Sequence, residues 1–293
     1  MKKLLFLLLI VPTIARSQAP ADSLRLWKTG GMISLNFSQV SLTNWIAGGK
    51  SSASGVFMVN TFANYKKDNI SWDNSIDLSY GFLKEKENTL VKSDDKIDLN
   101  SKLGVKASGR WNYSGLVNFK SQFAPGYAYP NTNDPISRFM APGYLNLAAG
   151  MDFKTEKISV FLSPVTGKFT FVTDPELSAL GSFGVDPGKK ARSEIGAFVK
   201  FEGKTDVVKN VSLQTKLDLF SNYLHNPQNI DVDWNMLINM KVNEYLSANF
   251  VSHLIYDDDI KIPIDNNGDG IIDESGPRIQ FMEMFGAGLS FKF

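Results

Sequence analysis

The sequence contains no cysteine and only two histidines among its 293 residues. Without cysteine, the chain can form neither a disulfide nor a thiolate nucleophile, and we expect no lipid anchor on a cysteine. Only two histidines are available as imidazole bases. The absence of cysteine therefore excludes thiolate catalysis and disulfide chemistry.

Long apolar runs are absent beyond the first residues of the chain. Residues 1–3 are basic, and the apolar run over residues 4–14 is shorter than the roughly 20 residues of a membrane helix. Small residues two positions apart follow at 15–17, so we predict a secretory signal over residues 1–17. Removal of this segment takes away three basic residues and changes the formal charge from +1 to 1 − 3 = −2. A charge this small and negative gives no indication of nucleic-acid binding.

The sequence is rich in segments with an apolar residue at every second position. In residues 96–108, Ile97, Leu99, Leu103 and Val105 alternate with charged and polar residues. This period of two is typical of a β-strand with one apolar and one polar face. Thirteen residues in a strand reach roughly 43 Å, and a tilt of about 45° reduces this to roughly 30 Å, the thickness of a bilayer core.

The same alternation predicts about twelve strands. They cover approximately residues 30–39, 55–66, 70–82, 96–108, 111–123, 145–153, 158–171, 195–201, 211–219, 232–242, 246–256 and 279–293. Long and short connections alternate strictly, as extracellular loops and periplasmic turns do in outer-membrane barrels. A soluble sandwich, or two small soluble domains, gives no reason for this alternation. We therefore predict an all-β fold, a transmembrane antiparallel up-and-down β-barrel over residues 30–293 with periplasmic termini, after a lead-in over residues 18–29.

The last predicted strand ends on an aromatic residue. Phe291 and Phe293 lie on its apolar face, and small or polar residues occupy the other face. A terminal aromatic after such alternation resembles the signal that the barrel-assembly machinery of Gram-negative bacteria reads. We therefore expect outer-membrane lipid and this machinery as partners, and the Gram-negative outer membrane as the location.

An Asp/Asn/Gly-rich stretch in the last long loop has the spacing of a calcium-binding loop. The candidate ligands are Asp265, Asn267, Asp269, the Ile271 carbonyl and Asp273. Oxygen ligands at positions one, three, five, seven and nine, with glycine at six, suit Ca²⁺. Position twelve is Gly276 instead of the bidentate glutamate, so Glu274 or the acidic run 257–259 would complete the shell. A solvated turn is the alternative, and we predict a Ca²⁺ that stiffens the loop.

The connection after the first strand contains the sequence N-W-I-A-G-G. Its candidate interaction residues are Asn44, Trp45, Gly48 and Gly49. The glycines permit backbone conformations that other residues avoid. One interpretation is a recognition loop that displays Trp45, and the other is a structural loop that folds Trp45 against the barrel rim.

His253 is the only histidine on a predicted strand. It would face the lumen in register with Ser247 and Asn249, the residue types of a Ser-His-Asn hydrolase. However, the reactive groups of an outer-membrane lipase must meet lipid, and His253 alternates with lipid-facing residues. We predict instead that His253 belongs to a polar network inside the barrel, and that the protein is not an enzyme.

Several stretches together resemble one family of Bacteroidota outer-membrane barrels, the domain-of-unknown-function 3078 family. They are W-K-T-G-G at 27–31, N-F-S-Q-V-S-L-T-N-W-I-A-G-G at 36–49, the late Asp/Gly loop and the terminal F-K-F. The resemblance covers essentially the mature chain, and its N-W-x-x-G-G stretch is the most specific part. It implies an outer-membrane barrel but no activity, and it supplies no catalytic residues.

These features lead to a functional expectation with one alternative. Long loops, a candidate Ca²⁺ loop and the lack of a reactive constellation indicate a non-enzymatic barrel that is a structural or interaction subunit of an envelope assembly, with an envelope protein as partner. Mixed lumenal charges, such as Asp98, Lys102 and Asp218, equally suit a narrow channel for small polar solutes.

Overall fold

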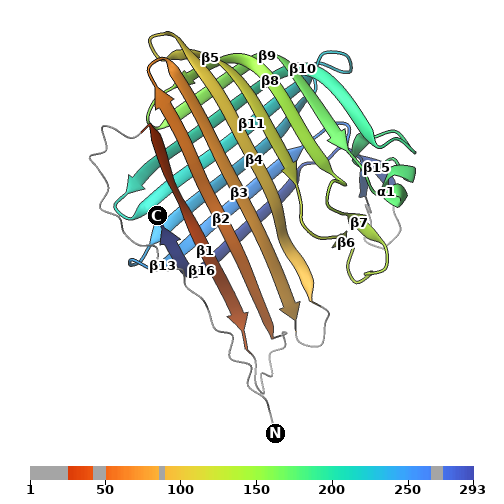
Figure 1. Ribbon diagram of the computed structural model, residues 1–293. Helices are drawn as coiled ribbons and strands as arrows, with labels where there is room; N and C mark the ends of the chain where they lie inside the picture. Colours follow the sequence, from red (N-terminus) through yellow and green to blue (C-terminus); the bar gives the residue numbers. More distant parts are fainter. Residues whose placement is uncertain (1–25, 42–50, 86–89, 265–272) are drawn as a thin grey trace.

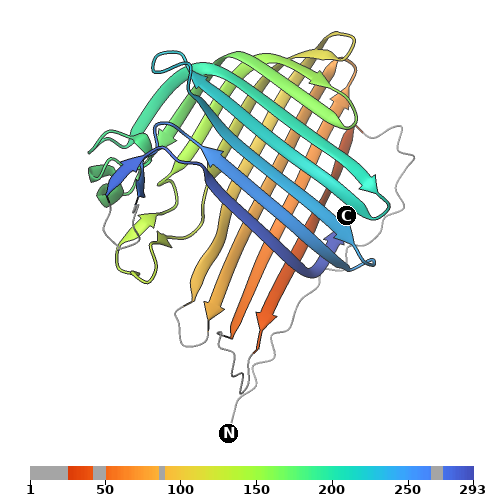
Figure 2. The same cartoon turned by 180° about the vertical axis from the view of Figure 1, so that it is seen from behind.

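The computed structural model describes residues 26–41, 51–85, 90–264 and 273–293. Twelve strands form one closed antiparallel barrel, in the order β1-β16-β13-β12-β11-β10-β9-β8-β5-β4-β3-β2 (Figures 1 and 2). Their bounds are β1 Trp27–Val40, β2 Ser52–Lys67, β3 Ile70–Glu85, β4 Val91–Ser108, β5 Trp111–Ser121, β8 Gly143–Lys154, β9 Ile158–Phe171, β10 Ala191–Val208, β11 Val211–Asn222, β12 Ile230–Lys241, β13 Leu246–Tyr256 and β16 Gln280–Lys292. The prediction of a twelve-stranded up-and-down barrel is confirmed.

Short turns join the strands at one end of the barrel. Asp68, Gly109 and Asn210 have positive φ angles in three of these turns, which is the conformation that glycine, asparagine and aspartate tolerate best. Both ends of the barrel sequence meet at this end, where Gly31 and Phe293 exchange two backbone hydrogen bonds of 3.0 and 3.1 Å. By the convention of bacterial barrels, this is the periplasmic end.

The long connections carry small structural elements of their own at the other end (Figure 1). They are the hairpin β6 (Gly126–Tyr127) and β7 (Pro135–Ser137), the helix α1 (Pro175–Ala179) with the 3₁₀ turn η2 (Ser182–Gly184), and the hairpin β14 (Ile262–Ile264) and β15 (Glu274–Gly276). Alternation predicts none of these elements. Helix α1 nevertheless has a local signal, since Asp174 caps the amides of Glu176 and Leu177 and Pro175 begins the first turn.

Most strand bounds differ from the prediction by a few residues, and the differences are largest at β4 and β10. β3 extends to Glu85 and β4 begins at Val91, so the connection between the strands predicted over 70–82 and 96–108 is much shorter. β10 continues to Val208, past the predicted end at residue 201 and past Gly203. Gly203 lies within the ladder, opposite Thr215 on one side and Ile158 on the other. Strand pairing on both sides therefore overrides the weak strand propensity of glycine here.

The outer face of the barrel is apolar and the inner face is polar. On β4, Leu99, Leu103 and Val105 are exposed on the outside, whereas Asp98 and Lys102 are buried inside. This is the reverse of a soluble barrel, and it suits a lipid-facing surface around a polar lumen. Among the described residues, no helix is both long and apolar enough to cross a membrane.

Aromatic side chains gather on the outer face close to the short turns. The ring of Trp27 lies 5.2 Å from that of Tyr65 and 5.7 Å from that of Trp72, and Trp111 lies 5.3 Å from Phe153. Tryptophan and tyrosine favour the membrane interface because their rings are apolar and their edges can hydrogen-bond. These clusters indicate the periplasmic girdle of the barrel.

One polar residue interrupts the apolar face of β3, and the structure explains how it is tolerated. Asn74 accepts a hydrogen bond from the Ser101 hydroxyl at 2.8 Å and donates to the Ala63 carbonyl at 3.1 Å. Ser101 in turn accepts from the indole of Trp72 at 2.8 Å. Because every polar group in this cluster has a partner, its position on the lipid side carries little desolvation penalty.

Candidate functional site in the barrel lumen

The middle of the lumen is filled by side chains. An apolar cluster lines the inner face of five neighbouring strands and consists of Leu116, Ala148, Phe161, Phe198 and Phe220. Phe161 is completely buried, and Leu116 and Phe198 are each only 2% exposed. In a water-filled pore these inward side chains would contact solvent, so this side of the lumen is closed at mid-height.

Charged side chains pack beside this apolar cluster and are paired with one another. Lys120 donates to Asp218 and to Asp233, each at 2.8 Å, and Lys200 donates to the other oxygen of Asp218 at 2.8 Å. The Nε2 atom of His253 lies 2.9 Å from Asp233. Buried charges in such a network require several partners, because an unpaired charge in a medium of low dielectric constant is costly.

Three further ion pairs tie distant strands together inside the barrel. Lys102 donates to Asp152 at 2.8 Å and to the Ser159 hydroxyl at 2.6 Å. Lys154 pairs with Asp73, and Lys216 pairs with Asp77. The mixed lumenal charges of the sequence are thus largely a cross-linked network and not the free lining of a wide pore.

Buried asparagines form a hydrogen-bonded chain in the periplasmic part of the lumen, near the seam between the first and last strands. Asn249 donates to Asn36 at 3.0 Å and accepts from Asn239 at 2.7 Å, and both bonds are buried. Asn249 and Asn36 belong to β13 and β1, which are separated by β16. Gly286 of β16 leaves room for the Asn36 side chain, since a Cβ at Gly286 would lie 3.0 Å from the Asn36 Cβ. Gly288 allows the backbone of β1 to approach closely, since a Cβ there would lie 2.0 Å from the Leu35 carbonyl oxygen.

The extracellular mouth of the lumen carries an excess of carboxylates. Lys168 contacts Asp231 at 2.5 Å, Asp257 at 3.2 Å and Glu194 at 3.8 Å. Arg192 pairs with Glu194 at 2.8 Å and with Asp259 at 3.0 Å. Four carboxylates therefore surround two cations, so the mouth is a negatively charged ring that repels anions arriving from outside.

Between this mouth and the filled layer lies a chamber of about 700 Å³. Loop residues Tyr127, Tyr129 and Phe183 line it from the extracellular side, and strand residues line it from within the barrel. A cavity of several hundred cubic ångströms with mixed apolar and polar walls is typical of a small-molecule site. The chamber is therefore the candidate functional site of this protein.

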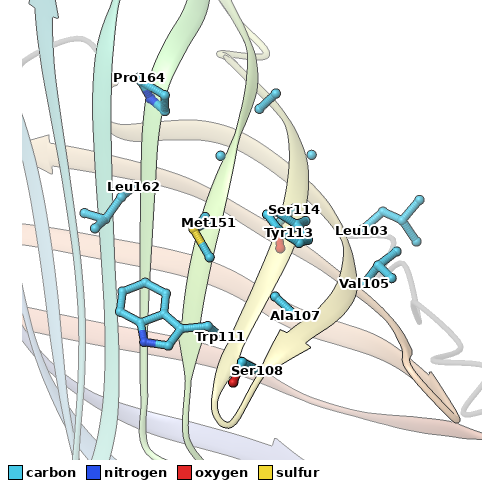
Figure 3. Close-up of a pocket in the computed structure, with 13 residues that line it drawn as sticks. Leu103, Val105, Ala107, Ser108, Trp111, Tyr113, Ser114, Met151, Leu162 and Pro164 are labelled. Carbon is cyan, nitrogen blue, oxygen red and sulfur yellow. The ribbon is translucent and has the colours of Figure 1, made fainter.

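A second concavity of about 1,070 Å³ lies on the outer face of β4, β5, β8 and β9 (Figure 3). Its lining combines small residues, such as Gly115 and Ala149, with larger side chains, such as Leu103, Trp111 and Leu162. These residues belong to the apolar outer surface near the periplasmic girdle. The groove is therefore part of the lipid-facing wall, and acyl chains of the membrane suffice to fill it.

The predicted Ca²⁺ loop falls largely outside the described residues. Asp265, Asn267, Asp269 and Ile271 lie there, whereas Asp273 is described and its amide donates to the Ile264 carbonyl at 2.9 Å. No group of three or more potential metal ligands occurs within the described ranges. The acidic residues expected to complete the shell have other partners: Asp257 and Asp259 pair with cations, Asp258 accepts from Asn229, and Glu274 pairs with Arg278.

The other predicted sites have mixed outcomes. Asn44, Trp45, Gly48 and Gly49 lie outside the described residues. Phe291 and Phe293 are exposed on the outer face, with stacked rings whose centroids are 6.3 Å apart. In the described structure no hydrogen bond joins His253 to Ser247 or Asn249. His253 contacts Asp233 instead, and Asn249 is hydrogen-bonded to Asn36 and Asn239. The predicted polar network around His253 is therefore present.

Some lumenal residues escape sequence reasoning. The sequence indicates Asp98, Lys102 and Asp218 as lumenal, but it does not single out Lys120, Lys168 or Lys200. Strand period alone places Lys120 on the inner face, in step with Asn118 and Leu116. The partners come from strands far apart in the chain, so neither the ion pairs nor the chamber has a local signal.

Comparisons with known proteins give one family match and several structural likenesses. The model of the family "Protein of unknown function (DUF3078)" matches residues 37–127, and no curated protein matches the chain. One similar solved structure is an outer membrane channel from Pseudomonas putida F1, with 14% identity over 94% of this chain and 100% of that chain and a TM-score of 0.41. Another is the translocator domain of the autotransporter NalP from Neisseria meningitidis, with 8% identity over 92% of this chain and 89% of that chain and a TM-score of 0.36. A third is outer membrane phospholipase A from Escherichia coli, with 9% identity over 94% of each chain and a TM-score of 0.35.

These structural likenesses have low identities and TM-scores below 0.5, so the fold assignment rests on the closed strand pairing and on the apolar outer face. The family match includes the N-W-x-x-G-G stretch on which the resemblance mainly depends. Over residues 37–127 the chain is therefore similar to the DUF3078 family of proteins of unknown function, and this stretch lies within a closed twelve-stranded β-barrel.

Proposed function

We propose that this protein is a non-enzymatic barrel of the Gram-negative outer membrane, whose lumen does not conduct ions and whose extracellular end binds another component of the envelope. The observation that carries the proposal is the filled layer at mid-height, where Phe161, Phe198 and Lys200 are almost fully buried. A channel needs a continuous water path, and paired charges within an apolar cluster disfavour one.

The structured loops supply the binding surface in this proposal. Arg138, just after β7, pairs with the helix cap Asp174 at 3.1 Å, and Arg192 on the rim pairs with Asp259 at 3.0 Å. The loop elements are thus bonded to one another and to the rim, and ordered loops on a rigid scaffold are typical of binding sites.

Recordings in planar bilayers test the closed lumen. Purified barrels that run as folded protein on gels are reconstituted beside a general porin as positive control. We expect no conductance steps from the protein at porin concentrations that give many steps. Regular steps whose number rises with the amount of folded barrel would overturn the proposal and favour the alternative, a narrow channel for small polar solutes.

A native pull-down tests the binding role. The tagged barrel is extracted in mild detergent, and co-purifying proteins are quantified by mass spectrometry against an unrelated tagged barrel. We expect an envelope protein at an amount comparable to the barrel itself. Shortening of the β6/β7 hairpin loop, residues 128–134, should reduce this recovery severalfold while the barrel still folds. Recovery of the barrel alone would contradict an interaction role.

A further inference from the structure

The seam between β1 and β16 is paired over only part of its length. Its register runs from the Met32/Lys292 pair to the Phe37/Ala287 pair, six pairs in all. Beyond this point, within the part of the chain that the structure describes, Ser38 to Val40 pair only with β2, and Gln280 to Gly286 pair only with β13. Figures 1 and 2 show the two strands running apart toward the extracellular side.

An unpaired strand edge at membrane depth has a physical consequence. Lipid cannot hydrogen-bond the backbone groups that this edge exposes, and each unsatisfied group costs several kcal/mol. Irregular backbone at such depth is tolerated where it borders a polar cavity. The chamber provides that border, because Gln280 and Met282 of the unpaired segment line it.

The chamber wall next to this seam carries a group of apolar side chains. Met58 on β2, Leu237 on β12, Val251 and Ile255 on β13 and Met282 on β16 all face inward and line the cavity. Polar side chains of the same strands, such as Asn235, His253 and Gln280, lie among them, and Lys96, Lys120 and Lys216 line the cavity from other strands. Contact of apolar side chains with water in the lumen of a barrel is unfavourable. An apolar part of a ligand would cover these side chains, so this wall matches a ligand with an apolar part. Methionine adapts well to flexible chains.

Lys96 marks the place for a head group. Of the lysines that line the chamber in the described ranges, Lys92, Lys120, Lys168 and Lys216 all pair with carboxylates, whereas Lys96 donates only to the neutral amide of Asn235, at 2.9 Å. Its ammonium has three donors, so two of them are available to an anion. A charge-assisted bond to such a lysine is stronger than a bond between neutral groups.

We propose that the chamber binds a membrane-derived amphiphile with one aliphatic chain and a single anionic head. The amphiphile enters between β1 and β16, and it places its chain against the methionine-containing wall and its head at Lys96. A fatty-acid carboxylate has this chemistry. The negatively charged mouth formed around Lys168 and Arg192 opposes entry of an anion through the loops, which leaves the seam as the favoured path. This inference goes beyond the proposed function, because a barrel can be closed to ions with or without such a ligand.

Binding is measured on folded barrels in nanodiscs of a neutral phosphatidylcholine, with radiolabelled dodecanoate as the probe and empty nanodiscs as the blank. We expect saturable binding of about one dodecanoate per barrel. Unlabelled dodecanoate should displace it far better than dodecanol or dodecyltrimethylammonium. Lys96→Met should weaken binding at least tenfold, and Lys96→Arg should largely retain it. The matched control Lys204→Met removes a lumenal lysine near the periplasmic end and should leave binding unchanged.

The path is tested with single thiols, since the natural chain has no cysteine. A polyethylene glycol maleimide on Gln39→Cys, at the seam, should slow uptake of dodecanoate several-fold. The same adduct on Asp134→Cys, in the β6/β7 loop, should not. The reverse pattern would overturn the seam as the path. No binding above empty nanodiscs, equal binding in Lys96→Met, or better displacement by the cationic amphiphile would overturn the ligand class, whatever the bilayer recordings show.

Discussion

A lysine on the outer face of β4 tests whether this face meets lipid. Leu103 is 51% exposed and lies six residues before the turn at Gly109. Six residues of strand span about 20 Å, and a tilt of about 45° places Leu103 roughly 14 Å from the periplasmic end of the hairpin, near the middle of the apolar band. Leu103→Lys should therefore cost about 2–4 kcal/mol.

A matched control lies on the same strand and the same face. Ala107 is two residues before the turn, so its depth from that end is only about 5 Å, close to the interface. Ala107→Lys should cost about 0–1 kcal/mol, because a lysine near the interface can extend its ammonium into water. The contrast between the two variants isolates membrane depth from the chemistry of the new side chain.

Reversible urea unfolding of the barrel in lipid vesicles, followed by tryptophan fluorescence, measures both costs. With a slope of about 2 kcal/mol per molar urea, a loss of about 3 kcal/mol lowers the midpoint by about 1.5 M. Equal shifts for the two variants, or no shift for Leu103→Lys, would show that this face is not embedded in lipid. The assignment of inner and outer faces would then be wrong throughout β4.

Two further predictions concern the lumen and the last loop. Lys102→Met should cost about 3–5 kcal/mol of folding stability, because it leaves the buried carboxylate of Asp152 without its cation. Adding Asp152→Leu should recover most of that loss in the same urea assay. Additive costs of the two substitutions would mean that the two side chains do not pair. Calorimetric titration with Ca²⁺ should give saturable heat that Asp269→Ala abolishes, and absence of heat in the natural chain would end the Ca²⁺ hypothesis.

The sequence predicts the barrel well because its main signal is local. A period of two needs no knowledge of the partner strand, and residues 158–171 and 246–256 are strands over the predicted bounds. Errors occur where pairing overrides propensity, as at Gly203, and where loops fold on themselves. Even there, Asp174-Pro175 is a readable start of helix α1, because a capping carboxylate followed by proline is typical of a first turn.

The candidate site is far less accessible to sequence reasoning. Lys96 and Asn235 are 139 positions apart, as are Lys216 and Asp77, and each pair meets only because the barrel closes. Alternation indicates that these side chains share the inner face, but it cannot indicate which of them are opposite. The distinction between a paired cation and Lys96, on which the ligand proposal depends, therefore requires the three-dimensional structure.

The glycines of the last strand show what the sequence predicts and what only the structure explains. The sequence predicts small residues on the inner face of β16, but a strand signal for the assembly machinery does not require glycine at positions 286 and 288. The reason appears in the closed barrel, where Gly286 leaves room for Asn36, which bonds Asn249 across the strand, and Gly288 allows close approach of the β1 backbone. This bond secures the periplasmic half of the seam, while the extracellular half, from Gly286 to Gln280, has no such link to β1 in the described residues. The seam thus has one hydrogen-bonded half and one half that is unpaired in the described residues, which is the arrangement that the proposed lateral entry of an amphiphile needs.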